Sequence, residues 1–340
     1  MEKQKSELIM IKLLLTFIVS FAVSLILMPL IIKYFRKKHA SQTILGYVEE
    51  HKEKNGTLTM GGVVFILTSL IVVFMFLEFD IFWLMVLLVS IFFGVLGYMD
   101  DHIKIKYKQN LGLRPYQKII GQVGISLIFA LFIYFSTIGG KIFIPFSEKM
   151  IDLKFFIIPL IMIVLVATTN SVNLTDGLDG LAGNVTIIYL VFFTAITSII
   201  HVNLYNQGET GAILKNIENI NCLSMIFIGS ILGFLIFNTS KASIFMGDVG
   251  SLCLGGYIGA SACALGLELI ILILGFCFVF SALSVILQVA CFKLKHKRIF
   301  KMAPFHHHLQ MSGLTEPKIV LIYSSLTACL GVFCIIFYLL

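Results

Sequence analysis

The sequence predicts an all-α polytopic membrane protein with about ten transmembrane helices, and three observations support this fold class. Hydrophobic residues make up 59% of the 340 positions and charged residues only 13%, and the mean hydropathy is +1.00. A water-soluble chain of this length cannot bury so much apolar surface. The apolar residues also occur in runs of bilayer length, and the basic residues gather between particular runs. We therefore expect residues 1–340 to form a single membrane-embedded bundle.

Each predicted helix corresponds to an apolar run close to the roughly 20 residues that cross a bilayer. The runs lie at 8–32, 61–78, 80–98, 119–138, 154–171, 181–200, 220–238, 251–266, 268–292 and 319–339. The first run has no small-residue cleavage site, so we interpret it as a retained span and not as a signal peptide. Segment 139–153 alternates apolar and polar residues around a turn-like Pro-Phe-Ser-Glu, which predicts a small external β-hairpin.

The basic residues indicate how the bundle is oriented. Most of the 25 Lys and Arg residues lie in the loops that follow the first, third and ninth runs. Because cytoplasmic loops are enriched in Lys and Arg, these loops are predicted to be cytoplasmic and both termini to lie outside. The net charge of +7 reflects this bias together with attraction to anionic lipid or phosphate. Nucleic-acid binding is not indicated, because the basic residues are spread over membrane-bound loops.

Five of the seven aspartates lie in three short polar interruptions of this apolar sequence: Asp100, Asp101, Asp176, Asp179 and Asp248. A carboxylate near lipid is costly, so such a cluster usually marks a site that handles cations, protons or phosphates. The charge distribution places all five at the predicted cytoplasmic ends of runs. We therefore expect a site at the cytoplasmic membrane surface. A cation channel or transporter, the non-enzymatic alternative, would place its carboxylates at mid-membrane.

The first interruption, YMDDHIKIKYKQ (98–109), ends the third run. Adjacent carboxylates such as Asp100 and Asp101 can hold a hard cation such as Mg²⁺, or one can act as a base while the other orients a ligand. The alternative is a solvated helix end at which the acids pair with Lys104 and its neighbours. This motif alone does not distinguish the two interpretations.

The second interruption, NLTDGLDG (173–180), places Asp176 and Asp179 three residues apart, on one face of a helical turn. Asn173 adds a neutral hydrogen-bonding group, and the glycines allow the backbone to approach a ligand. A turn between two spans needs Asn and Gly but has no use for two acids. A functional role is therefore favoured for this motif.

The third interruption, IFMGDVGS (244–251), has the form of a tight turn that opens a helix. Backbone N–H groups at such a helix start suit phosphate, and Asp248 can bring a metal ion to it. The alternative is simple helix capping by Asp248 or Ser251. Phe245 precedes the turn and is placed to stack on a base, although a lone Phe is more often packed in the interior.

Two further polar segments complete the inventory. MAPFHHHLQ places three histidines in the last cytoplasmic loop, where hydrogen bonds to phosphate or sugar oxygens fit better than one shared Zn²⁺, and a plain polar loop is the alternative. KNGTLTMGG supplies Lys54 and Thr59; the lysine suits a diphosphate, although alone the segment indicates only a flexible positive loop. Acids for a cation, lysines for phosphates and histidines at one membrane surface are typical of magnesium-assisted phosphoryl transfer.

These motifs, in this order and spacing, resemble the polyprenyl-phosphate N-acetylhexosamine-1-phosphate transferases. The similarity runs from Lys54 to Pro317, and the APFHHH and EPKIV stretches resemble the branch that acts on UDP-MurNAc-pentapeptide. The resemblance implies transfer of phospho-MurNAc-pentapeptide from that donor to undecaprenyl phosphate, which forms lipid I and UMP with Mg²⁺ as cofactor, the first membrane step of peptidoglycan synthesis. It also implies a multi-pass protein of the bacterial cell membrane, an active site on the cytoplasmic face and a homodimer. A sibling enzyme that uses UDP-GlcNAc is the alternative, because it employs the same aspartates.

Residue roles follow from the same resemblance. It implies that Asp248 holds Mg²⁺, that Asp100 activates the lipid phosphate and that Asp101 supports that site, so these three are the expected catalytic residues. The expected substrate-binding residues are Lys54, Thr59, Lys104, Lys118, Asn173, Asp176, Phe245, His306, His307 and His308.

The chain also departs from the family pattern at three positions. Leu58 stands where the family usually has Pro, and Val249 stands where Thr is frequent. Gln310 stands where an acid commonly follows the histidines, which puts any role for an acid at that position in doubt.

Overall fold

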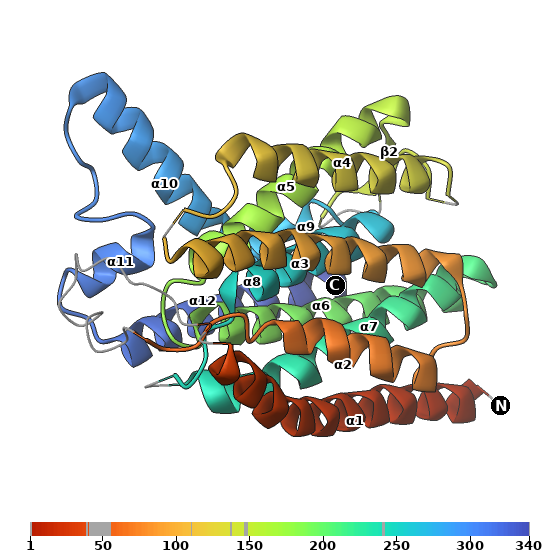
Figure 1. Ribbon diagram of the computed structural model, residues 1–340. Helices are drawn as coiled ribbons and strands as arrows, with labels where there is room; N and C mark the ends of the chain where they lie inside the picture. Colours follow the sequence, from red (N-terminus) through yellow and green to blue (C-terminus); the bar gives the residue numbers. More distant parts are fainter. Residues whose placement is uncertain are drawn as a thin grey trace.

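A computed structural model of the protein describes residues 2–38, 40, 56–109, 111–136, 138–145, 149–239 and 242–339, with side chains from residue 7 onward. Over these residues the chain is a helical bundle with one two-stranded sheet. Most of the long helices lie side by side and roughly parallel or antiparallel, as Figure 1 shows. The predicted class, an all-α protein with a small hairpin, is confirmed at this level.

The elements follow one another along the chain as twelve helices, one 3₁₀ turn and two strands in the described residues. They are α1 (Glu2–Lys37), α2 (Val63–Phe76), α3 (Ile81–Tyr107), α4 (Pro115–Tyr134), β1 (Lys141–Phe143), β2 (Met150–Asp152), η2 (Lys154–Phe156), α5 (Ile157–Thr175), α6 (Leu181–Asn206), α7 (Ala212–Asn238), α8 (Gly247–Ala264), α9 (Ile270–Leu274), α10 (Phe276–Lys295), α11 (Phe305–Gln310) and α12 (Glu316–Leu339).

Eight of the described helices are long and apolar enough to cross a membrane, which confirms a polytopic membrane protein. They are α1, α3, α4, α5 with η2, α6, α7, α10 and α12. The other two predicted spans correspond to α2, which is apolar but has only 14 residues, and to α8, which has 18. Each of the ten apolar runs thus contains helix.

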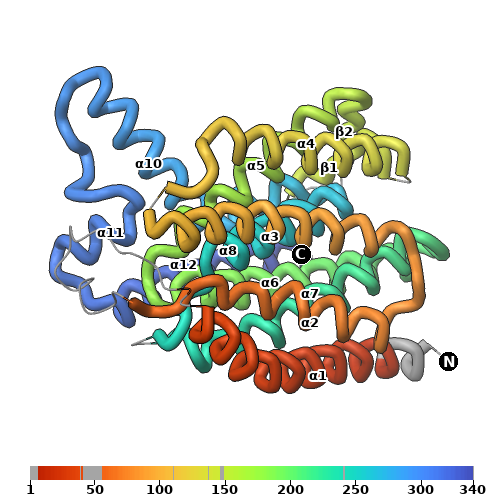
Figure 2. Tube along the Cα trace, in the orientation of Figure 1, coloured from red at the N-terminus to blue at the C-terminus, as the bar shows by residue number. Residues whose placement is uncertain are grey.

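The ninth run departs from the prediction of one continuous helix over 268–292. It forms two helices, α9 and α10, which are separated at Gly275. The Gly275 N–H still donates to the Ile271 carbonyl at 2.9 Å, but the residue leaves helical geometry, with φ −90° and ψ 17°. Beyond this break α10 projects away from the body of the bundle, as Figures 1 and 2 show.

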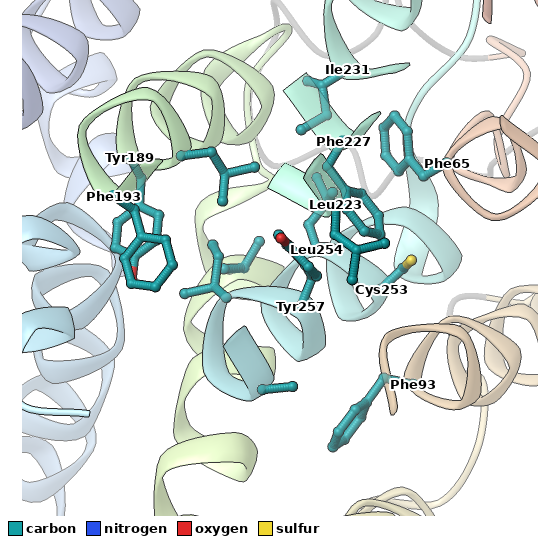
Figure 3. Packing of buried hydrophobic residues seen from close by; sticks show 14 of the residues in the cluster. Phe65, Phe93, Tyr189, Phe193, Leu223, Phe227, Ile231, Cys253, Leu254 and Tyr257 are labelled. Carbon is teal, nitrogen blue, oxygen red and sulfur yellow. The ribbon is translucent and has the colours of Figure 1, made fainter. Parts of the chain in front are cut away.

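Helix α8 lies at the centre of the bundle because small side chains let its neighbours approach. All residues at 249–264 are buried, and α8 packs most closely against α3 and α5. Gly97 of α3 lies against the Asp248 carbonyl, where any Cβ would clash with the backbone. On the α7 side, Tyr257 stacks on Phe227 with ring centroids 4.2 Å apart and shares a hydrogen bond of 2.8 Å with Ser224 (Figure 3). This packing fixes the first turn of α8 beside the last turns of α3.

The predicted hairpin is confirmed as β1 and β2, which pair antiparallel with Ile142 opposite Ile151. It does not stand apart from the bundle, because the Phe143 N–H donates to the Gly266 carbonyl at 2.8 Å. Gly266 follows α8, so the hairpin is attached to the end of α8 that is opposite to Asp248.

Candidate active site

Three of the five predicted aspartates meet at one end of the bundle. Asp100 and Asp101 lie near the end of α3, and Asp248 lies in the first turn of α8. One carboxylate oxygen from each of the three lies within 4.8 Å of the others, and both α3 aspartates are buried. Residues 148 positions apart in sequence therefore form one acidic cluster, because α3 and α8 pack together at Gly97.

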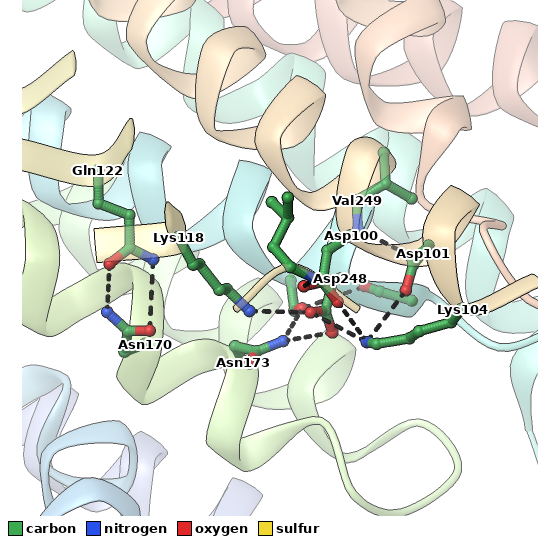
Figure 4. A network of polar contacts seen from close by, with 12 residues as sticks. Asp100, Asp101, Lys104, Lys118, Gln122, Asn170, Asn173, Asp248 and Val249 are labelled. Atoms are coloured by element: carbon green, nitrogen blue, oxygen red, sulfur yellow. Dashed lines mark hydrogen bonds and ion pairs between the residues drawn. The ribbon is translucent and has the colours of Figure 1, made fainter. Parts of the chain in front are cut away.

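Two lysines offset part of the negative charge of this cluster. Lys104 Nζ lies 2.6 Å from Asp100 Oδ2, 3.5 Å from Asp101 Oδ1 and 3.2 Å from Asp248 Oδ2. Lys118, from α4, donates to Asp248 Oδ2 at 2.8 Å (Figure 4). The ordinary helix-end pairing between Asp100 and Lys104 is present, but it belongs to a network that joins three helices.

The second oxygen of Asp248 is also engaged. The Asn173 side-chain amide donates 2.9 Å bonds to Asp248 Oδ1 and to Ser251 Oγ. Burial would raise the pKa of the Asp248 carboxyl, but Lys118 and Lys104 outweigh it and hold this pKa below its ordinary value. Asp248 is therefore an anion that faces two cations, and its neighbours orient both of its oxygens.

The two α3 aspartates are held by backbone groups as well as by Lys104. Asp100 Oδ1 accepts a 2.9 Å hydrogen bond from the Leu113 N–H, in the segment between α3 and α4. Asp101 Oδ2 accepts a 3.2 Å bond from the Val249 N–H, at the start of α8. The Val249 that replaces the family's frequent Thr contributes its backbone here, so its side chain is not needed for this contact.

The remaining two predicted aspartates have different surroundings. Asp176 is half-buried just after α5, and burial, with the negative charges of Asp248, Asp101 and Asp179 adding to it, raises its pKa to about 8. It therefore lies within electrostatic reach of the acidic cluster without being one of its three members. Asp179 Oδ2 accepts a 3.3 Å hydrogen bond from the Ala242 N–H and so holds the 173–180 turn against the segment before α8.

The three consecutive histidines differ in their orientation. His306 is completely buried, and its Nε2 lies against Gly177, where a Cβ could not be accommodated. The Nε2 of His307 faces the same glycine. His308 lies elsewhere: its Nδ1 accepts a 3.1 Å bond from the Lys301 N–H. Two of the three histidines therefore adjoin the turn that carries Asp176.

Burial also sets the protonation of His306. It lowers the pKa of this imidazole well below the usual value, and the neighbouring His307 lowers it further. His306 is therefore a neutral ring at physiological pH, which can offer one N–H donor and one acceptor nitrogen.

An acid does lie close to the histidines in spite of Gln310. Gln310 Oε1 lies 3.3 Å from His307 Nδ1, and its amide nitrogen lies 3.5 Å from Glu316 Oε1. Glu316 opens α12, and its other oxygen lies 3.4 Å from the Asp179 N–H. The glutamine thus connects the histidine segment to a carboxylate that sequence reasoning did not single out.

Two of the remaining predicted site residues, Thr59 and Phe245, lie in the segments before α2 and α8. Thr59 is buried beside Gly247, close to the Asp101 carboxylate. Phe245 is half-buried; its N–H donates to the Leu58 carbonyl at 2.7 Å, and its carbonyl accepts from Gly61. Leu58, one of the family departures, takes part in this contact through its backbone. Lys54 lies outside the described residues.

Comparison with known proteins identifies the family. Residues 83–266 match the family described as Glycosyl transferase family 4, and this region includes all three members of the acidic cluster. The chain is 40% identical over 331 residues to the phospho-N-acetylmuramoyl-pentapeptide-transferase of Halalkalibacterium halodurans, with 92% of this chain and 93% of the relative covered. It is 42% identical over 316 residues to the enzyme of that name from Clostridium novyi, with the same coverage. The chain belongs to the phospho-N-acetylmuramoyl-pentapeptide-transferase family.

A third relative shows that the similarity extends over nearly the whole chain. The phospho-N-acetylmuramoyl-pentapeptide-transferase of Bacillus subtilis is 37% identical over 331 residues, with 94% of this chain and 97% of the relative covered. The three relatives come from bacteria, and the similarity to each covers more than nine-tenths of this chain.

In this member of the transferase family, the structure adds two residues that sequence reasoning missed. Gln122 of α4 and Asn170 of α5 exchange side-chain hydrogen bonds of 2.8 and 3.3 Å (Figure 4). Gln122 lies one turn after Lys118, and Asn170 lies one turn before Asn173. The amide pair therefore joins α4 to α5 in the register that brings Lys118 and Asn173 to Asp248. The sequence did contain a signal for this pair, because each of the two apolar runs includes one uncharged amide side chain.

Gln122→Leu is expected to lower the stability by about 1–2 kcal/mol and turnover by roughly tenfold, since a 1.4 kcal/mol loss in the transition state is a factor of ten. The leucine leaves the Asn170 amide without its buried partner and loosens the α4–α5 register. Thermal unfolding in detergent and steady-state kinetics would measure the two effects.

The double variant Gln122→Leu/Asn170→Leu provides the control for this prediction. If the amides act as a pair, the double variant loses less stability than the sum of the two single variants, because each single change already breaks the interaction. Strictly additive losses would show that the pair does not couple the helices.

Proposed function

We propose that this chain transfers phospho-MurNAc-pentapeptide from UDP-MurNAc-pentapeptide to undecaprenyl phosphate, producing lipid I and UMP. The observation that carries the proposal is the meeting of Asp100, Asp101 and Asp248 with Lys104 and Lys118 at one end of an apolar bundle. Phosphoryl transfer depends mainly on positioning and on neutralising charge, and this cluster supplies both. The names of relatives that are about 40% identical support the choice of donor and acceptor.

In this reaction an oxygen of undecaprenyl phosphate forms a bond to the sugar-linked phosphorus of the donor. The bond from that phosphorus to the bridging oxygen breaks, and UMP leaves with the electron pair. Asp100 is the group that we assign to the acceptor phosphate, from which it takes a proton when the phosphate is protonated. Lys104 and Lys118 offset the negative charge that two phosphorylated substrates bring to the site.

The acidic cluster also fits a magnesium ion. Three carboxylate oxygens from separate aspartates lie within 4.8 Å of one another, and hard cations prefer such oxygen donors. We assign Asp248 as the principal ligand, with Asp100 and Asp101 beside it. When bound, Mg²⁺ supplies charge stabilisation at the phosphate oxygens.

We assign the nucleotide side of the donor to the residues around the 173–180 turn. His306 and His307 face Gly177, which follows Asp176 in the chain, and the charges of Asp248 and Asp101 in the acidic cluster help to raise the pKa of Asp176. Asn173 joins this turn directly to Asp248. Thr59, in the segment before α2, lies near Asp101, and Phe245 lies in the segment before α8. We assign both, with His308 and Lys54, to substrate binding.

The proposal includes a topology with ten spans and both termini outside. The spans are the eight long apolar helices together with α2 and α8. This places the acidic cluster on the cytoplasmic face of a bacterial cell membrane, where a soluble nucleotide sugar reaches it, and lysine-rich loops on that face support the orientation. We extend the proposal to a homodimer, which light scattering of the detergent-solubilised protein would test.

Purified protein with UDP-MurNAc-pentapeptide, undecaprenyl phosphate and Mg²⁺ is expected to form equal amounts of UMP and lipid I. Absence of both products from protein with a normal unfolding transition would refute the proposal.

Replacing the donor by UDP-GlcNAc tests the sibling activity, and faster turnover with that donor would assign the chain to the sibling reaction. Ion flux through liposomes that is independent of the nucleotide sugar would favour a channel.

Removal of divalent cations is expected to abolish turnover reversibly. Three carboxylates and two phosphorylated substrates leave more negative charge than Lys104 and Lys118 can offset. Chelation should lower the rate at least about 100-fold, which corresponds to nearly 3 kcal/mol, and added Mg²⁺ should restore it. Full activity after chelation would contradict the assignment of Asp248 to a metal.

A further inference from the structure

A cavity of about 360 Å³ lies at the end of the bundle away from the acidic cluster. Side chains from the end of α6, the start of α7, the β1–β2 hairpin and the turn after α8 form its wall. Asp248 lies in the first turn of α8 and Leu265 of the cavity lies just after its end, so the 18 residues of α8 separate the two by about 27 Å at 1.5 Å per residue. Pockets of about 300–1,000 Å³ are those that bind small ligands, and the transfer reaction has no use for this one.

The wall of the cavity becomes more polar beyond the last turn of α6. Thr197, Ile200 and Leu204 recur at intervals of three or four and therefore share one face of the helix. Gln207 and Glu209 continue the wall beyond the last turn of α6. This arrangement of apolar and polar side chains is complementary to a ligand that has an apolar part and a polar head, with the head toward the end of the bundle.

The hairpin forms a fixed part of this wall. Lys141 and Phe143 of β1 line the cavity, as does Met150 of β2. The 2.8 Å hydrogen bond from the Phe143 N–H to Gly266 holds the hairpin to the turn after α8, whose Leu265 also lines the cavity. In Figure 2 the strands lie at the end of the bundle opposite to α11. The predicted hairpin thus forms one wall of the cavity.

Asn216 of α7 supplies a mostly buried polar side chain to the wall of the cavity. It lines the cavity and is only 6% exposed. Within the described part of the chain its side-chain amide makes no hydrogen bond. Thr197, the other buried polar residue of the wall, already donates to Asn221 Oδ1 at 2.6 Å. The amide is therefore accessible from the cavity and can form a hydrogen bond with a ligand there.

Charge then identifies the class of the head group. Lys141 and Glu209 contribute one positive and one negative side chain to the wall, and both are exposed. We infer that the cavity binds the head-group end of one bilayer phospholipid, with a zwitterionic head group of the phosphoethanolamine kind. Its phosphate is complementary to Lys141, its ammonium to Glu209 and its ester or phosphate oxygens to Asn216, while the part of an acyl chain next to the head group contacts the apolar wall.

Other occupants correspond less well to these residues. An acidic phospholipid lacks the ammonium that pairs with Glu209, and its net charge would be repelled by that carboxylate. Ordered water needs two to four polar partners for each molecule, and most of this wall is apolar. A zwitterionic amphiphile satisfies the apolar wall, the amide and the charge pair together.

Native mass spectrometry of the full-length protein in mild detergent tests the inference. Delipidated protein is titrated with phosphatidylethanolamine or with phosphatidylglycerol of the same acyl chains. We expect one saturable phosphatidylethanolamine site, with phosphatidylglycerol bound more weakly. Asn216→Leu should weaken phosphatidylethanolamine binding about tenfold, through the lost hydrogen bond and the filled cavity. Glu209→Gln, at an exposed position, should reduce the preference for phosphatidylethanolamine over phosphatidylglycerol.

Lys215→Gln is the matched control. Lys215 is next to Asn216 in sequence, but its Nζ lies 3.6 Å from Asp80 Oδ2 and it does not line the cavity. This variant should bind phosphatidylethanolamine as the parent protein does. The inference is overturned if the parent protein shows no saturable site, if it binds both lipids equally, or if Asn216→Leu and Glu209→Gln bind as Lys215→Gln does. None of these results depends on the transfer reaction, so they leave the proposed function unaffected.

Discussion

Replacing Asp248 by asparagine is expected to lower lipid I formation by at least about 1,000-fold, or roughly 4 kcal/mol of transition-state stabilisation. Asp248 is the only described residue that contacts Lys104, Lys118 and Asn173 together. Asparagine retains the size of the side chain but removes the negative charge that faces both lysines and that we assign to Mg²⁺. The rate with UDP-MurNAc-pentapeptide and undecaprenyl phosphate at saturating Mg²⁺ would measure the effect.

Asp152→Asn is the control for this substitution, because it makes the same chemical change at an exposed aspartate of β2. It should alter turnover less than about twofold, as surface substitutions usually change stability by no more than about 0.5 kcal/mol. Thermal unfolding must show that the Asp248 variant remains folded. If a folded Asp248→Asn protein retained a tenth of the parent rate, Asp248 could not be the principal metal ligand.

Hydrophobic patterning predicted the helices well, because a bilayer imposes a nearly fixed length on every apolar run. It could not predict the break at Gly275, since a glycine within an apolar run leaves the hydropathy unchanged and the break depends on tertiary packing. Nor does patterning reveal that α8 is central. That position depends on the close approach of α3 at Gly97, which is a property of two surfaces in contact.

The candidate site was predictable in composition but not in pairing. The five aspartates were recognisable as out of place in an apolar sequence, and three of them do meet. Asp179 instead accepts from the Ala242 N–H, a contact that requires knowledge of where the segment before α8 lies. The Gln122–Asn170 pair was missed for the same reason. Each amide forms its hydrogen bond with a residue of another helix, and the sequence does not show which helices are neighbours.

Replacing Asp100 by asparagine is expected to lower kcat by about 100- to 1,000-fold, the usual contribution of a positioned acid or base, while KM for UDP-MurNAc-pentapeptide changes by less than about threefold. Asparagine can still accept the hydrogen bond from the Leu113 N–H. The donor contacts that we assign to the 173–180 turn are untouched. Steady-state kinetics with each substrate varied in turn would separate kcat from KM.

Asp101→Asn provides the comparison, because it changes the neighbouring carboxylate in the same way. Asp101 lies 3.5 Å from Lys104 Nζ, whereas Asp100 lies at 2.6 Å, and its other oxygen accepts from the Val249 N–H. We therefore expect a loss of only about tenfold, or 1.4 kcal/mol, for Asp101→Asn. A larger loss at Asp101 than at Asp100 would reverse the two assignments.

A single-turnover experiment without undecaprenyl phosphate distinguishes the two chemical roles of Asp100. If Asp100 acts on the acceptor phosphate, the parent enzyme releases no UMP until lipid is added. If Asp100 attacks the donor itself, UMP appears at once in an amount equal to the enzyme, together with a phosphosugar adduct. We expect no such burst, because the Asp100 side chain is only 5% exposed and the backbone at Gly112 packs against its carboxylate. A buried carboxylate can still exchange a proton with a phosphate, but it cannot easily reach a phosphorus atom in line with the leaving group.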